Sequence, residues 1–199
     1  QSVHAPDEVK GTGTSGETTY SVTPATSTLT ATVNGPVSSP LTKGTLTGTA
    51  AETYYEVNIP AGTKASQITI HFDPAADTIV GVVWGRMVDG VPQDGAFADP
   101  DSNGTSTISL RQPNAGKLFV AVIAVGSTDD TVTPYTYQVN NITEDSPVTG
   151  KVTVTPDHAR VTPGTPTDLT ATWSGVPAGA RSTVWIEYPN GAGTLLTLN

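Results

Sequence analysis

Apolar and polar residues alternate along several short segments, and this alternation predicts β-strands. The segments 55–59 and 68–72 place an apolar side chain at every second position, which is the period of a strand with one buried face. The segments 79–84 and 118–125 are almost wholly apolar, which is typical of strands buried on both faces. Since no segment has a sustained helical period, the sequence predicts an all-β chain.

Composition and turn residues divide the chain into three ranges. Residues 1–47 form a segment rich in Thr, Ser and Gly, and residues 48–146 contain the strongest strand patterns. Residues 147–199 contain about four predicted strands, which is few for an independent core without disulfides. We therefore expect 48–146 to be a β-sandwich and 147–199 to be an immunoglobulin-like β-module that needs further strands.

A weak internal repeat indicates where those strands could come from. The segment 22–32 is similar to 161–172, and both have the pattern of a strand, a proline turn and a second strand. Two arrangements remain open. Either 1–47 and 147–199 pair with each other to build one immunoglobulin-like module, or each packs separately against the middle module.

Composition and charge narrow the class of protein. Hydrophobic residues make up 36% and charged residues 14%, with 20 glycines and 16 prolines, which favours packed modules with many turns. The absence of cysteine excludes disulfides and thiolate metal sites. A net charge of −9 disfavours nucleic acid and anionic membranes as partners, and no apolar run reaches the roughly 18 residues of a spanning helix. Since no signal peptide starts at Gln1, we expect the chain to come from a longer precursor.

Two strand segments carry a resemblance to a known family. The segment 55–63 resembles the opening of a bacterial pre-peptidase C-terminal domain. The segment 113–122 resembles a late strand of the same domain, with Pro113 and Gly116 at the matching positions and Phe119 in the region of the usual tyrosine. The resemblance implies that 48–146 is a jelly-roll-like β-sandwich of the kind that follows the catalytic domain of secreted proteases.

The flanking segments extend this resemblance over most of the chain. The segment 5–16 and the segments 152–156, 164–166 and 173–175 are similar to the C-terminal region of actinobacterial subtilisin-like serine peptidases. The resemblance implies an extracellular or cell-surface location, an immunoglobulin- or fibronectin-like last module, and the parent catalytic domain as a partner. The aspartate-rich central strand of the family is reduced here to Asp77, which puts any function of those aspartates in doubt.

The residues themselves predict that this chain is not an enzyme. Ser15 lies in a Gly-Thr-Ser-Gly sequence followed by a threonine-rich β-segment, whereas a subtilisin-type nucleophile opens a helix. The histidines His4, His71 and His158 are far apart in the sequence, and none belongs to a recognisable set of nucleophile, base and carboxylate. A serine nucleophile needs a positioned base and an orienting carboxylate, and no such set is evident.

One loop resembles the start of a calcium-binding loop. Oxygen-bearing side chains recur at alternate positions, and a glycine permits a sharp turn; the candidate calcium ligands are Asp99, Asp101, Asn103 and Thr105. The position of the usual bidentate glutamate, however, is Leu110. A hairpin-like loop held by Asx turns is therefore the alternative.

Aromatic residues offer a second kind of candidate site. Trp84, Trp185 and Tyr188 are the predicted ligand-binding residues, and Tyr54 is a further candidate. Trp185 and Tyr188 should point to opposite faces of one strand, so one of the two rings should face outward. Outward rings could bind a glycan or another protein, whereas inward rings would pack in the core.

Three functions follow from the sequence. The first is a non-catalytic accessory region of a secreted subtilisin-like peptidase that contributes stability, substrate access or surface attachment. The second is a free-standing adhesion module that binds an extracellular protein or a glycan. The third is a stalk that spaces other domains.

Overall fold

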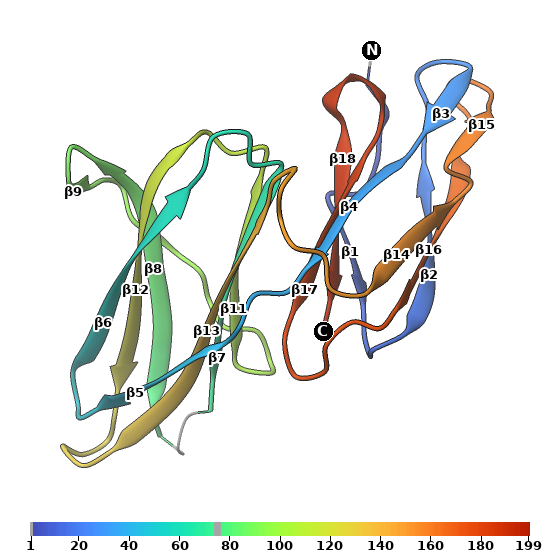
Figure 1. Cartoon of the computed structure of the whole chain (residues 1–199). Helices are drawn as coiled ribbons and strands as arrows, with labels where there is room; N and C mark the ends of the chain where they lie inside the picture. Colours follow the sequence, from blue (N-terminus) through green and yellow to red (C-terminus); the bar gives the residue numbers. More distant parts are fainter. Residues whose placement is uncertain (1, 74–76) are drawn as a thin grey trace. The chain divides into compact units, whose positions relative to one another are not determined.

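The computed structural model describes residues 2–73 and 77–199 as an all-β protein made of two compact units (Figure 1). Unit 1 contains the segment that ends at Ser38 and the segment Ile142–Asn199, and unit 2 is Ser39–Asn141. The described residues form several mainly antiparallel sheets and one short 3-10 turn at Pro189–Gly191, without an α-helix. Unit 2 is therefore inserted within the sequence of unit 1.

The observed boundaries follow Ser38 and Asn141, nine and five residues before those expected from composition. The sequence grouped the strand Thr42–Thr47, named β5, with the threonine-rich residues 1–47. In the structure, β5 pairs with β13 (Val132–Ile142) and belongs to unit 2. Composition is a poor guide here because threonine-rich strands occur in both units.

Unit 1 contains two main sheets and a small two-stranded sheet. The four-stranded sheet has the order β1 (Glu8–Gly11), β18 (Gly193–Leu198), β17 (Ser182–Glu187), β4 (Thr32–Val37). The three-stranded sheet has the order β14 (Lys151–Thr155), β16 (Thr167–Ser174), β2 (Gly16–Val22), and the two-stranded sheet pairs β15 (His158–Arg160) with β3 (Thr28–Thr30). The strands β1 and β18 run parallel, and the other pairs are antiparallel.

Strands from the two ends of the chain pair with each other in each of these sheets. The ladder between β2 and β16 runs from the pair Val22–Thr167 to the pair Gly16–Trp173. The strand β4 pairs with β17, and β3 pairs with β15. The two sequence segments therefore share one hydrophobic core, in which Leu169, Val184 and Leu196 are fully buried.

A series of hydrogen-bonded hydroxyl groups, called here the hydroxyl chain, crosses this core; it consists of Tyr20, Tyr188 and Thr194. The hydroxyl of Tyr188 donates to Thr194 Oγ1 at 2.9 Å, and Thr194 Oγ1 donates to the carbonyl of Pro6 at 2.8 Å. Since the proton of Tyr188 is used in this way, the hydroxyl of Tyr20 donates to Tyr188 across 2.7 Å. The hydroxyls of Tyr20, Tyr188 and Thr194 thus each have a partner, which offsets the cost of removing them from water.

Removing the hydroxyl of Tyr188, the middle group of the hydroxyl chain, should destabilise the fold. We expect Tyr188→Phe to lower the free energy of unfolding by about 1–3 kcal/mol, because it leaves the donor of Tyr20 and the acceptor of Thr194 buried without their partner. Urea denaturation of the purified chain measures this change. Tyr20→Phe is the matched control and should cost less, since it leaves no buried donor unsatisfied. An equal or smaller loss for Tyr188→Phe would contradict the assigned donor directions.

The same tyrosine predicts a dependence of stability on alkaline pH. Burial, together with the neighbouring Tyr188, raises the pKa of Tyr20 above its ordinary value of 10.0. The folded chain therefore keeps a proton that the unfolded chain loses, so the free energy of unfolding should fall as the pH rises above about 10. Urea denaturation between about pH 9 and pH 11 tests this. The fall should be shallower in Tyr20→Phe, and an unchanged slope would contradict the prediction.

Unit 2 consists of two sheets packed face to face. The first has the order β10 (Ala96–Phe97), β8 (Ile79–Val88), β12 (Gly116–Val125), β6 (Ala51–Ile59), with β9 (Val91–Pro92) also paired to β8; the second has the order β11 (Thr105–Arg111), β7 (Ala65–Phe72), β13, β5. The core lies between the sheets, where Ile68, Ile70, Val82 and Val120 are fully buried. The alternation at 55–59 and 68–72 thus corresponds to inward residues of β6 and β7.

Candidate functional site

The outer side of the five-stranded sheet of unit 2 is the strongest candidate site. The register places Tyr54 opposite Ala121, Ala121 opposite Val83, and Val83 opposite Phe97, so one apolar row crosses four neighbouring strands. Further rows on the same side contain residues of β12 and β8. We call this side of the sheet the apolar face; it comprises Tyr54, Ile79, Val83, Phe97, Phe119, Ala121, Ile123 and Val125. Phe119 and Ala121, at its centre, are buried beneath their neighbours.

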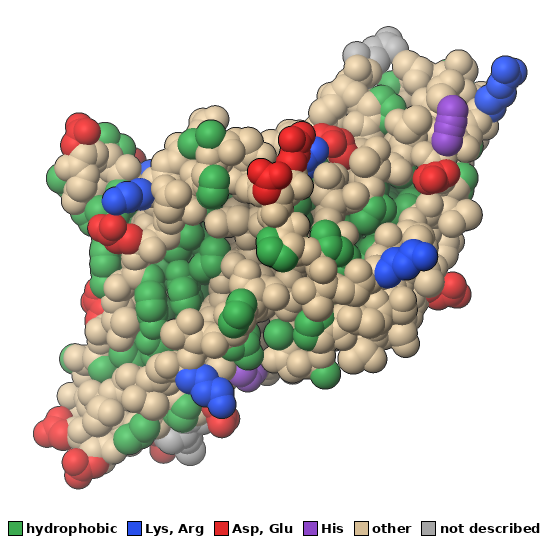
Figure 2. All heavy atoms as spheres, in the orientation of Figure 1, with side chains coloured by type: hydrophobic (Ala, Val, Ile, Leu, Met, Phe, Trp, Pro, Cys, Tyr) green, Lys and Arg blue, Asp and Glu red, His purple; other side chains and the backbone are tan. Residues whose placement is uncertain are grey.

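Exposed hydrophobic side chains are concentrated on this sheet. Among the described residues, six of the nine large hydrophobic side chains that are exposed lie on β6, β8, β9, β10 and β12. Phe97 and Ile79 are 77% and 71% exposed, and Tyr54 is 44% exposed. Figure 2 shows hydrophobic side chains at the surface in the region of β6 and β12 on the side it presents. Scattered single residues would be ordinary, but a contiguous patch marks an interaction surface.

The structure confirms only in part the expectation that 79–84 and 118–125 are buried on both faces: 118–122 are buried on both, whereas other outward positions are not. The inward residues Val82, Leu118 and Val120 are buried in the core as expected. The outward residues of the same runs belong to the apolar face, where Phe119 and Ala121 are buried but Ile79 and Val125 are exposed. Apolar residues at every position show that both sides of a strand avoid polar groups, but they do not show that protein covers both sides.

An aromatic pair gives the apolar face a fixed centre. The rings of Tyr54 and Phe119 are parallel within 3°, with centroids 5.8 Å apart, and the Tyr54 hydroxyl lies 3.6 Å from the sulfur of Met87. Phe119 is held against the sheet because Gly85 lies beside it; a Cβ at Gly85 would come within 2.8 Å of the ring. The position of Phe119 therefore depends on a neighbour without a side chain.

Gly81 is an open position in the apolar face. It lies opposite Ile123 in the ladder between β8 and β12. A Cβ at Gly81 would meet no atom within 4 Å, so the space above its backbone is open. A glycine inside a strand often marks a place where a ligand or another backbone approaches closely.

Charged groups lie beside the aromatic pair. Glu52 and Glu56 flank Tyr54 on the outward side of β6, and both are exposed. Lys117, on β12, lies 3.7 Å from Glu56. An apolar centre with an aromatic pair and charged residues at its edge has the composition of a protein interface.

The aromatic residues predicted from the sequence do not lie on this surface. Trp84 is on the inward side of β8 and packs against the core of unit 2. Trp185 and Tyr188 are only 1% and 3% exposed, so the expectation that one of them faces outward is wrong. Trp185 lies over Gly193, whose lack of a side chain leaves room for the indole, and Tyr188 belongs to the hydroxyl chain.

The predicted calcium loop is held together by Asp101. Its Oδ1 accepts the backbone N–H groups of Asn103 at 2.8 Å and Thr105 at 3.1 Å. The Thr105 carbonyl, the expected backbone ligand, accepts the N–H of Asp101, and the Thr105 hydroxyl lies 2.9 Å from His71 Nδ1. Asp99 is exposed. Within residues 2–73 and 77–199, no three His, Cys, Asp or Glu side chains are grouped to hold a metal, and calcium binding stays a prediction.

This geometry separates the roles of the two aspartates. Asp101→Ala should lower the free energy of unfolding by about 1–2 kcal/mol, because two backbone N–H groups lose a carboxylate acceptor. Asp99→Ala is the matched control and should have little effect. Thermal unfolding with calcium and with a chelator measures both variants. A calcium-dependent shift that either substitution abolishes would show instead that the loop binds the cation.

Ser15 and the histidines lie on different elements. Ser15 is in the loop between β1 and β2, His4 is bridged to Thr23, and His158 is on β15, whereas His71 is on β7 of unit 2. Of the described helical segments, none is long and apolar enough to cross a membrane.

Comparisons with known proteins give only distant likenesses. No protein-family model and no curated protein matches the sequence. Among solved structures, PliG of Aeromonas hydrophila, a periplasmic inhibitor of g-type lysozyme, is similar at 18% identity and a TM-score of 0.34, over 53% of this chain and 87% of that chain. The Gap123 complex of Streptococcus agalactiae is similar at 11% identity and a TM-score of 0.39, over 91% of this chain and 38% of that chain.

A viral structure is similar at a comparably low identity and TM-score. The VP2 subviral particle of infectious bursal disease virus matches at 9% identity and a TM-score of 0.35, over 78% of this chain and 40% of that chain. These likenesses concern a β-rich, sandwich-like architecture alone.

Proposed function

We propose that the chain is a non-catalytic accessory region of a secreted or cell-surface protein, and that the apolar face of unit 2 binds a macromolecular partner. The observation that carries the proposal is the gathering of exposed hydrophobic side chains on one sheet. Exposing such a contiguous surface to water costs free energy, and burying it against a partner recovers that cost.

The topology supports a finer description of both units. In unit 2 the orders β5-β13-β7-β11 and β6-β12-β8-β10 are those of two interleaved Greek keys, which supports a jelly roll. In unit 1 the strands β2, β16 and β14 face β4, β17 and β18, as in an immunoglobulin-like sandwich. Both folds are common in extracellular proteins, which agrees with the proposed location.

The nature of the apolar face favours a protein partner. Its central rows combine the aliphatic side chains of Val83 and Ile123 with the stacked pair Tyr54 and Phe119. Aliphatic and aromatic residues together are typical of the buried core of a protein interface. The resemblance to subtilisin-like peptidases supports the catalytic domain of the same precursor as this partner, with a role in enzyme stability, substrate access or surface attachment.

The two exposed rings favour a second candidate function. Tyr54 and Phe97 lie on opposite edge strands of the sheet, and both rings are accessible. Exposed rings can stack on sugar units, so a free-standing adhesion module that binds a glycan, or an unrelated extracellular protein, is the alternative.

A charge placed at Gly81, within the apolar face, tests the proposal. Gly81→Glu adds a side chain where nothing obstructs it, so the fold should be kept. Binding to the catalytic domain encoded upstream in the precursor, measured by calorimetry, should weaken by roughly 100-fold, because the carboxylate would be buried without a partner. Thr172→Glu, at an exposed position of β16, is the matched control and should bind normally.

The other outcomes of this experiment are equally informative. Normal binding by Gly81→Glu would show that the apolar face is not the binding surface. If the wild-type chain does not bind the catalytic domain but binds an immobilised glycan in a Gly81-dependent way, the adhesion function replaces the accessory function.

A further inference from the structure

One edge of the three-stranded sheet in unit 1 is unpaired over most of its length. The strand β2 is the last strand of the order β14-β16-β2, so only β16 pairs with it along Gly16–Val22. Just beyond its end, His4 forms an antiparallel bridge with Thr23, with N–O distances of 2.9 and 2.7 Å. Within the described parts of unit 1, no strand continues this pairing alongside β2.

The bridge fixes which backbone groups point outward along the edge. Both the N–H and the C=O of Thr23 are directed to His4. In an antiparallel ladder, successive residues direct these groups to alternate sides. Ser21, Thr19 and Glu17 therefore direct their N–H and C=O groups to the unpaired edge, and the residues between them pair with β16.

The edge is unpaired because the chain leaves it at Pro6. Proline has no N–H to continue a ladder, and the carbonyl of Pro6 is held by the hydroxyl of Thr194. The next residue, Asp7, accepts a hydrogen bond from the N–H of Leu195, and the chain continues as β1 alongside β18 in the other sheet. The segment before β1 therefore lies beside the end of β2 at His4 and, after Pro6, crosses to the other sheet.

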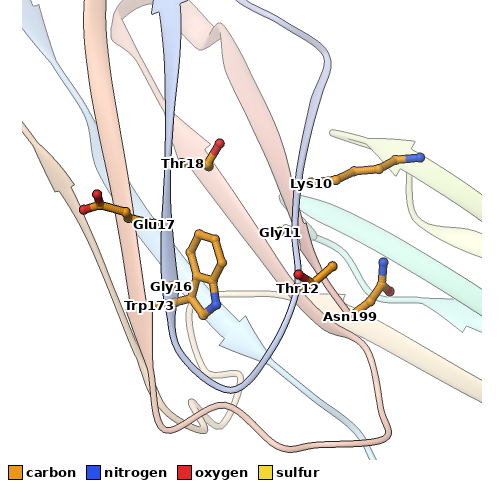
Figure 3. A pocket seen from close by; sticks show the side chains of 8 residues that line it. All are labelled: Lys10, Gly11, Thr12, Gly16, Glu17, Thr18, Trp173 and Asn199. Carbon is orange, nitrogen blue, oxygen red and sulfur yellow. The ribbon is translucent and has the colours of Figure 1, made fainter.

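A groove of about 390 Å³ lies between β1 and β2 where the chain has crossed (Figure 3). Gly11, Gly16, Thr18 and the indole of Trp173 are among the residues that line it. A Cβ at Gly11 or Gly16 would come within 2.5 or 2.7 Å of the indole. Trp173 is fixed by a hydrogen bond of 3.2 Å from Nε1 to the carbonyl of Gly13. The groove thus has a rigid aromatic wall and bare backbone at Gly11 and Gly16, and the polar residues Lys10, Glu17 and Asn199 are also part of its lining.

The edge of β2 also lacks the features that usually prevent strand addition. Edge strands are commonly protected by charged residues, proline, bulges or short length. In the same unit, β4 contains Pro36 and pairs with a register shift, and the short β1 contains two charged residues. In contrast, β2 has seven residues, no proline and a single charged side chain, Glu17.

We propose that the free edge of β2 binds an extended segment of a different protein as an added antiparallel strand. The partner continues the pairing that His4 begins, and its backbone bonds to Glu17, Thr19 and Ser21. Strand addition takes its affinity from such backbone bonds and its specificity from pockets for alternate side chains. A partner residue opposite Thr18 directs its side chain to the inner side of the sheet, so the groove beside Trp173 selects an apolar residue there. This site belongs to unit 1 and is independent of the apolar face.

The test uses the whole chain and a displayed library of ten-residue peptides with alternating apolar and polar positions. Peptides selected on the wild-type chain are measured by fluorescence anisotropy. Thr19→Pro removes the central outward N–H but keeps the side of β2 that pairs with β16, and it should weaken binding roughly tenfold or more. Thr19→Val keeps the N–H and should bind as the wild type. Thr18→Leu, which fills the groove, should weaken binding while leaving the edge intact.

Amide hydrogen exchange supplies a readout that a general loss of stability would not reproduce. Bound peptide should protect the amides of Glu17, Thr19 and Ser21, whereas those of Thr18 and Tyr20 should already be protected in the free chain. The proposal is overturned if no peptide is selected, if selected peptides bind Thr19→Pro as tightly as the wild type, or if the outward amides stay unprotected. It is also overturned if the edge is occupied by a second copy of the chain, shown by dimers in sedimentation that Thr19→Pro dissociates.

Discussion

The ladder between β2 and β16 is the interaction on which unit 1 depends. It joins residues that are far apart in the sequence; the contacting hydroxyls of Thr19 and Thr170 are separated by 151 positions. Without this ladder and the pairing of β4 with β17, neither the first nor the last segment of the chain has enough strands for a core. The two segments of unit 1 must therefore come together around an inserted unit that is about as large as unit 1 itself.

The inserted unit lowers the cost of this closure. The backbone N–H of Ser39 donates to Asn140 Oδ1 at 2.8 Å, and Gln138 Nε2 donates to the carbonyl of Ser39 at 2.8 Å. The first and last residues of unit 2 are thus held next to each other by hydrogen bonds within the unit. Once unit 2 is folded, the loop that unit 1 must close is short, and the entropy cost of loop closure grows with loop length.

The sequence predicted where the strands lie better than it predicted which residues cover the faces of each strand. Alternation correctly placed the inward residues of β6 and β7, because a period of two follows from the geometry of a single strand. It also correctly put Trp185 and Tyr188 on opposite faces of their strand. It could not show that both faces of β17 are covered, since this depends on other strands: on Gly193 in the next strand and on Tyr20, which is distant in the sequence. The exposed outward positions Ile79 on β8 and Val125 on β12 escaped prediction for the same reason.

The parallel pairing of β1 with β18 has a mechanical consequence. The two strands pair in register from Glu8–Leu195 to Gly11–Leu198. A force that pulls the segment before β1 away from the segment after β18 acts along both strands in opposite directions. All hydrogen bonds of this ladder then resist the force together in shear instead of breaking one by one. Unit 2 lies outside this path, so it bears no tension until unit 1 has opened.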